Sequence, residues 1–119
     1  MFLFRRGPAR ITAAEAHRRV SAGEAVLIDV RERPEWDAGH AGDAVHLPLS
    51  RLTPDTPLPR KAAGRPLITI CRSGNRSRRA AKVLAARGAD VVDVRGGMTA
   101  WAAAGLPQRG RHRTTGRGR

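Results

Sequence analysis

Residues 67–77 constrain the fold of this chain more than any other stretch, because they join an apolar run to the only cysteine. The β-branched run at residues 67–70 predicts a buried strand, and Cys71 follows it directly. A short polar loop comes next, and the alanine-rich residues 77–87 predict a helix that ends at a glycine. The thiol is therefore expected between the end of a strand and the start of a helix.

This position makes Cys71 a candidate nucleophile. Successive backbone N–H groups converge in a tight strand-loop-helix turn, and the helix N-terminus adds partial positive charge. Both favour an anion, either the Cys71 thiolate or an oxyanion bound above it, and Arg72 and Arg76 add full positive charges nearby. A lone cysteine is commonly an unreactive buried residue. The Cys-x4-Arg-Ser loop after a buried strand favours the catalytic interpretation.

Composition limits the other classes of function. The chain has 119 residues, enough for one domain, and its single cysteine excludes an intrachain disulfide. The net charge is +13, and arginines concentrated near the C-terminus predict a disordered basic tail at residues 108–119. Such a tail gives salt-sensitive contacts with nucleic acid. Without interleaved aromatic residues or a DNA-reading motif, specific recognition is not expected.

Neither a cofactor nor a metal is expected, because the four histidines are scattered and Cys71 stands alone. No apolar run reaches the length of about 18 residues that a membrane span needs, and the N-terminus does not resemble a signal peptide. A cytoplasmic protein without membrane contact is the resulting expectation.

Predicted strands and helices alternate over residues 11–107, which form the expected domain after an N-terminal segment at residues 1–10. Helices are predicted at residues 13–20, 33–39 and 98–104, and further strands at residues 25–30, 44–48 and 91–94. The alternation predicts an α/β fold with an open, mainly parallel sheet and helices on both faces. Asp29 and Arg31 then lie at the same edge of the sheet as Cys71.

The chain resembles the single-domain rhodanese family, whose members are thiosulfate sulfurtransferase-like, over most of its length. Five motifs in order carry the resemblance. They are Ile28-Asp29-Val30-Arg31, Glu35-Trp36-Asp37-Ala38-Gly39-His40, Ala44-Val45-His46-Leu47-Pro48, Cys71-Arg72-Ser73-Gly74-Asn75-Arg76-Ser77 and Gly96-Gly97-Met98-Thr99-Ala100-Trp101. One departure is Ala41-Gly42-Asp43, where the family usually has Ile-Pro-Gly, and it predicts a looser loop beside the site.

The resemblance implies a rhodanese-like fold and sulfur transfer through a persulfide of Cys71. The donor would be a small molecule such as thiosulfate, and the acceptor would be cyanide, a thiol or a protein. The loop would bind the persulfide and the donor through Arg72, Ser73, Gly74, Asn75, Arg76 and Ser77. On this basis Cys71→Ser is expected to abolish transfer, and Arg76→Ala to weaken use of the donor.

Other residues of the motifs are interpreted as structural. Asp29 and Arg31 are expected to form an ion pair or to hold neighbouring loops. His40 is expected to bond to the backbone, because a thiolate stabilised by its loop needs no base. Glu35 and Trp101 are interpreted as framework.

Three alternatives remain open at this point. A cysteine phosphatase uses a Cys-x5-Arg loop, whereas Arg76 is already the fifth residue after Cys71, so the loop here is one residue shorter. A non-enzymatic docking or sulfur-carrier module is the second alternative, although inactive members commonly lack the cysteine. A nucleic-acid binder that uses the basic tail is the third.

Overall fold

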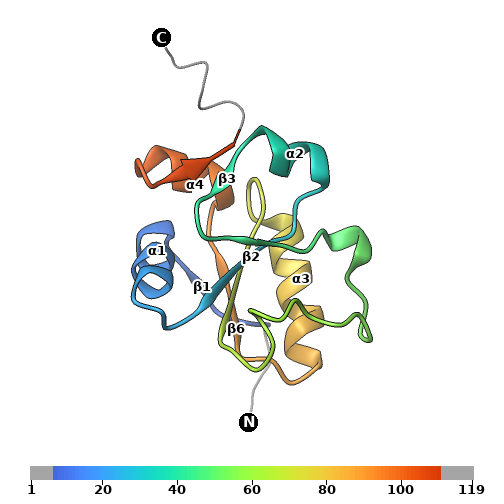
Figure 1. Cartoon of the computed structure of the whole chain (residues 1–119). Helices are drawn as coiled ribbons and strands as arrows, with labels where there is room; N and C mark the ends of the chain where they lie inside the picture. Colours follow the sequence, from blue (N-terminus) through green and yellow to red (C-terminus); the bar gives the residue numbers. More distant parts are fainter. Residues whose placement is uncertain (1–6, 111–119) are drawn as a thin grey trace.

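The computed structural model describes residues 7–110. A sheet of five strands runs in the order β1-β6-β5-β2-β4, and every neighbouring pair in it is parallel. Its strands are β1 (Arg10–Ile11), β2 (Val26–Asp29), β4 (Val45–His46), β5 (Leu67–Ile70) and β6 (Val91–Val94). Two short strands, β3 (His40–Ala41) and β7 (Gln108–Arg109), form a separate antiparallel pair (Figure 1). The predicted α/β fold with a mainly parallel sheet is confirmed.

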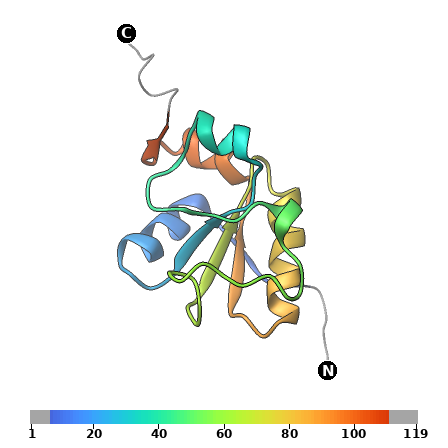
Figure 2. The same cartoon turned by 45° about the vertical axis from the view of Figure 1, so that its right-hand side comes forward.

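Helices cover both faces of the sheet, as predicted. The helices α1 (Ala13–Ser21) and α4 (Gly97–Ala103) pack on one face, and α3 (Asn75–Ala86) packs on the other (Figures 1 and 2). The short helix α2 (Arg33–Ala38) follows the carboxyl end of β2, and a turn of 3-10 helix, η1, covers Leu49–Arg51. None of the helices within residues 7–110 is long and apolar enough to cross a bilayer.

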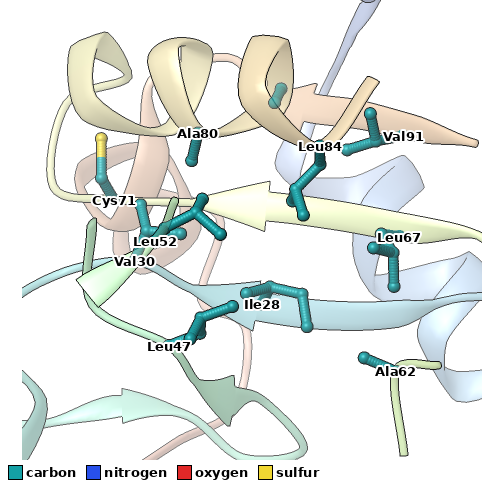
Figure 3. Packing of buried hydrophobic residues seen from close by; sticks show 11 residues of the cluster. Ile28, Val30, Leu47, Leu52, Ala62, Leu67, Cys71, Ala80, Leu84 and Val91 are labelled. Atoms are coloured by element: carbon teal, nitrogen blue, oxygen red, sulfur yellow. The ribbon is translucent and has the colours of Figure 1, made fainter. Parts of the chain in front are cut away.

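The two faces of the sheet carry separate cores because side chains alternate along each strand. Ile28 and Leu67 point to the α3 side, where they meet Leu84 and the small residues of that helix (Figure 3). Leu27 and Ile68 belong to the other core, with Trp101 of α4. These strands are buried on both faces, which explains why they appear in the sequence as continuous apolar runs.

This topology places the Cys71 loop at the centre of one edge of the sheet. β5 lies between β2 and β6, so the loop after β5 emerges between the carboxyl ends of two neighbouring strands. Asp29 stands beside Ile70 in the register of β2 and β5. In open α/β sheets this edge is where ligands bind.

Some boundaries differ from the sequence predictions. α3 begins two residues earlier than predicted, at Asn75, because the loop turns into the helix at Gly74 without a capping side chain. β1, β3 and β7 were not predicted, because each has only two residues and, unlike β4, none lies in a longer apolar run. Pairing in β7 extends past the predicted domain end at Pro107. Residues 111–119 of the predicted tail lie outside the described residues, as do residues 1–6.

Candidate active site

Backbone N–H groups surround the Cys71 sulfur. Gly74 donates its N–H to Cys71 Sγ at 3.1 Å, and Ser77 donates its N–H at 3.3 Å. The Ser77 hydroxyl oxygen lies 3.4 Å from the same sulfur. In Figure 3 the sulfur points from the end of β5 toward the start of α3. Hydrogen bonds of this kind stabilise negative charge on the sulfur.

The loop needs glycine at Gly74. Its φ is +118°, a left-handed value that side chains rarely adopt, and a Cβ there would lie 2.5 Å from Nη2 of Arg10. Ser77, on the first turn of α3, is fully buried, and its hydroxyl donates to the Gly74 carbonyl at 3.3 Å. The chain therefore turns tightly enough to aim two N–H groups at one sulfur atom.

The N-terminus of α4 holds the first part of the loop. Met98 N–H donates to the Cys71 carbonyl at 2.7 Å, and Thr99 N–H donates to the Arg72 carbonyl at 3.0 Å. A Cβ on Gly97 would collide with the Cys71 carbonyl oxygen and would lie 2.6 Å from the Arg72 carbonyl oxygen. The Gly-Gly motif of the sequence thus allows α4 to approach the backbone on which Cys71 sits.

Arg76 forms a bidentate ion pair with Glu35 on α2. Its two terminal nitrogens lie 2.6 and 2.8 Å from the two carboxylate oxygens. The guanidinium hydrogen bonds hold the pKa of Glu35 down from 4.5 to about 2, and the carboxylate in turn raises the pKa of Arg76. Glu35 Oε1 also accepts the Glu32 N–H at 3.1 Å. Sequence reasoning assigned Arg76 to the donor, whereas in the structure its guanidinium joins α3 to α2.

Replacing Glu35 with Gln is expected to lower the free energy of unfolding in a pH-dependent way. The folded-state pKa of Glu35 lies below 4.5, so the pair stabilises the fold above about pH 4.5 and loses this contribution as the pH falls toward 2. Both side chains are about 30% exposed, which reduces the expected loss at neutral pH to about 1–2 kcal/mol. Urea unfolding of wild type and the Glu35→Gln variant at several pH values measures this loss.

Asp37→Asn is the matched control, because Asp37 pairs with Arg33 at 3.1 Å on the exposed surface of the same helix. This variant is expected to lose roughly 0–0.5 kcal/mol. A loss for Glu35→Gln that did not shrink between pH 7 and pH 2 would contradict the assigned pair.

The outer residues of the loop face solvent. Arg72, Ser73 and Asn75 are exposed. Within residues 7–110 the Arg72 guanidinium makes no ion pair or hydrogen bond, unlike that of Arg76. Arg72 is therefore the cation of this loop that is available to an incoming anion. Cys71 itself is only 1% exposed.

Asp29 and Arg31 form a buried pair at the carboxyl end of β2. Arg31 Nη2 lies 2.7 Å from Asp29 Oδ2 and donates to the Gly39 carbonyl at 2.6 Å. Asp29 is fully buried and Arg31 is 7% exposed, so the two charges neutralise each other away from water. The pair fixes the segment that follows α2.

Two histidines stack on Trp36 beside this pair. His40 Nδ1 donates to the Trp36 carbonyl at 2.8 Å, and its ring stacks on the indole with centroids 3.5 Å apart. The His46 ring stacks on the same indole, and its Nε2 donates to the Arg31 carbonyl at 2.7 Å. The segment that departs from the family pattern, residues 41–43, begins in the adjacent strand β3. Its first residue, Ala41, is fully buried and pairs with Gln108 of β7.

Sequence reasoning missed a second set of contacts behind the loop. Arg10 Nε lies 2.8 Å from the buried Asp93 carboxylate, and Arg10 Nη2 donates to the Gly74 carbonyl at 3.3 Å. Thr69 on β5 donates its hydroxyl to the Ser77 carbonyl at 2.9 Å. The signal in the sequence was Asp93, which interrupts an apolar run as Asp29 does.

Residues 7–110 contain no group of three or more histidine, cysteine, aspartate or glutamate side chains arranged to hold a metal ion. The chemistry available at this site is that of the Cys71 sulfur, the N–H groups around it and the exposed Arg72.

Comparison with known proteins shows which family this chain resembles in sequence. The family model described as the rhodanese-like domain matches residues 12–104. An uncharacterized protein of Synechocystis sp. is 43% identical over 83 residues, which are 69% of this chain and 45% of that protein. An adenylyltransferase and sulfurtransferase of Yarrowia lipolytica is 31% identical over 102 residues, 80% of this chain and 26% of that protein. The chain therefore spans less than half the length of these relatives.

Among solved structures, a rhodanese-related protein of Thermoplasma volcanium superposes with a TM-score of 0.74 at 30% identity. The match covers 85% of this chain and 97% of that protein. The likeness thus extends over nearly the whole of that protein chain.

Proposed function

Because the chain belongs to the rhodanese-like domain family, we propose that it transfers sulfane sulfur through a persulfide on Cys71. The observation that carries the proposal is the pair of N–H groups, from Gly74 and Ser77, that donate to Cys71 Sγ. Both N–H groups point at one sulfur atom and favour negative charge there. A relative named as a sulfurtransferase supports the same chemistry.

In the proposed first half-reaction, the Cys71 thiolate attacks the outer sulfur of a donor such as thiosulfate. The bond between Cys71 Sγ and that sulfur forms as the sulfur-sulfur bond of thiosulfate breaks, and sulfite leaves with the electron pair. The negative charge moves to the outer sulfur of the persulfide, and the N–H groups of Gly74 and Ser77 remain directed at Cys71 Sγ.

In the second half-reaction, a nucleophilic acceptor attacks the outer sulfur of the persulfide. Cyanide would leave as thiocyanate, a thiol would become a persulfide, and in each case the Cys71 thiolate is regenerated. The cycle needs no cofactor. The steady-state test is thiocyanate formation at varied thiosulfate and cyanide, for which parallel double-reciprocal lines are expected; intersecting lines would show that the donor and the acceptor must bind together.

Arg72→Ala is expected to raise the KM for thiosulfate by roughly tenfold while changing kcat by less than about threefold. The physical reason is that Arg72 is exposed and free to pair with an oxyanion, whereas Arg76 is already occupied by Glu35. Arg60→Ala removes the same charge from an exposed position in the linker before β5 and serves as the control. Equal effects of the two variants on KM would mean that only net charge matters.

The burial of Cys71 favours one second candidate, a carrier or docking module that receives sulfur from a protein. Cys71 is only 1% exposed, so a donor reaches the sulfur only if the exposed residues of the loop move. A dedicated protein donor could induce such a movement. Sulfur uptake from thiosulfate alone distinguishes the two functions.

A further inference from the structure

A basic cavity lies on the α3 face of the sheet, apart from residues 71–77. It has a volume of about 630 Å³ and opens between the segment before β1, α3 and β6. Its lining residues are Gly7, Pro8, Ala9, Arg10, Arg78, Ala81, Lys82, Asp93 and Arg95. Cavities of this size commonly hold small-molecule ligands.

The charge of this cavity is unbalanced. Asp93, the one acidic side chain among the described lining residues, is 1% exposed and already paired with Arg10 at 2.8 Å. Arg78, Lys82 and Arg95 are exposed, and none of them forms an ion pair within residues 7–110. Three positive charges therefore surround one cavity without an acidic counterpart, and their mutual repulsion is relieved when an anion binds.

Several arginines on the other helices are paired with acidic side chains. On α1, Arg18 pairs with Glu15 and Glu24, and on α2, Arg33 pairs with Asp37. Exposed cations without an ion pair also occur elsewhere within residues 7–110, Arg72 and Arg79 among them, so the distinguishing feature of the cavity is that three such cations line one hollow. Arg78 and Lys82 stand four residues apart on α3, a spacing at which like charges destabilise a helix unless something binds between them.

The side chains that line the cavity indicate which class of anion it can bind. Small residues leave the space open: a Cβ on Gly7 would lie 3.1 Å from Cε of Lys82, and Ala81 lies between the two cations of α3. Guanidinium groups bind phosphate oxygens through paired hydrogen bonds. Among the described residues, the lining contains no aromatic side chain on which a nucleic-acid base could stack.

We propose that this cavity binds a small phosphorylated anion with two or more negative charges, held by Arg78, Lys82 and Arg95. Arg10 links the site to the catalytic loop, because the same guanidinium that pairs with Asp93 donates to the Gly74 carbonyl. Binding of the anion to this cavity does not depend on the proposed sulfur transfer, because it can be measured by titration in the absence of sulfur donor and acceptor.

Calorimetric titration of the full chain with inorganic pyrophosphate tests the proposal, using wild type and the double variant Arg78→Ala/Lys82→Ala. The expected result is saturable one-site binding to wild type that weakens at least about tenfold in the variant. The control is Arg79→Ala/Lys61→Ala, which removes one arginine and one lysine from exposed positions outside the cavity. It is expected to bind pyrophosphate within about twofold of wild type.

Two results would overturn the proposal: equal weakening of pyrophosphate binding in both double variants, and absence of saturable binding to wild type. In the second case, binding of a DNA duplex that depended on Arg78 and Lys82 would assign the cavity to nucleic acid instead. Thiocyanate formation by the cavity variant, assayed in parallel, is expected to stay within about twofold of wild type. Loss of pyrophosphate binding with retained turnover separates this site from the one at Cys71.

Discussion

Replacing Cys71 with Ser is expected to lower thiosulfate-dependent thiocyanate formation by on the order of 10⁴-fold or more, because a serine hydroxyl cannot form a persulfide. The variant should remain folded. Serine is close to cysteine in size, and its oxygen can accept the N–H groups of Gly74 and Ser77 that now point at the sulfur. The expected change in the free energy of unfolding is therefore within about 1 kcal/mol.

Two measurements make this prediction decisive. Urea unfolding establishes that the variant is folded, and the cyanide assay is then run at equal concentrations of folded protein. Cys71→Ala is a companion variant that removes the nucleophile without supplying a new hydrogen-bond acceptor. Turnover within tenfold of wild type by either folded variant would exclude Cys71 as the carrier of sulfur.

Gly97→Ala is expected to have the largest effect on stability, about 3–5 kcal/mol. Gly97 has a φ of +53°, and a Cβ there would collide with the carbonyl oxygen of Cys71. Relief of the collision moves α4 away from the loop and breaks the bonds from Met98 N–H and Thr99 N–H to the Cys71 and Arg72 carbonyls. The loop then loses the support that positions the sulfur, so turnover of the remaining folded protein should also fall.

Gly105→Ala is the control that introduces backbone strain without a steric collision. Gly105 has a φ of +71°, but a Cβ on it would meet no atom within 4 Å. This variant is expected to lose only about 1 kcal/mol of the free energy of unfolding, because alanine disfavours the left-handed backbone conformation, and its turnover should change little. If urea unfolding gave the same loss for Gly97→Ala and Gly105→Ala, close packing of α4 on the Cys71 backbone would not be the reason for Gly97.

The central features of the fold were predictable because they depend on local pattern. The apolar runs before Asp29 and Cys71 identify buried parallel strands, and the carboxyl ends of such strands meet at one edge. The order of β2, β5 and β6 in the sheet then places the Cys71 loop between its neighbours. The rhodanese-like assignment needed the motifs in addition to this pattern.

The partners of the charged residues were not predictable in the same way. Glu35 and Arg76 are separated by 41 residues, and Arg10 and Asp93 by 83, so their pairing depends on how α2 and β1 pack. Sequence spacing placed Arg76 in the loop and could not show that its guanidinium already holds a carboxylate. Arg72, the neighbour of the cysteine, thereby becomes the residue proposed to receive the donor.

The intact mass of the purified protein before and after exposure to thiosulfate, with Cys71→Ser measured alongside, shows whether Cys71 carries sulfur. Wild type is expected to gain the mass of one sulfur atom that cyanide then removes, and the variant is expected to gain nothing. A folded wild-type protein that gained no sulfur from thiosulfate, or a Cys71→Ser variant that gained as much as wild type, would contradict the proposed persulfide.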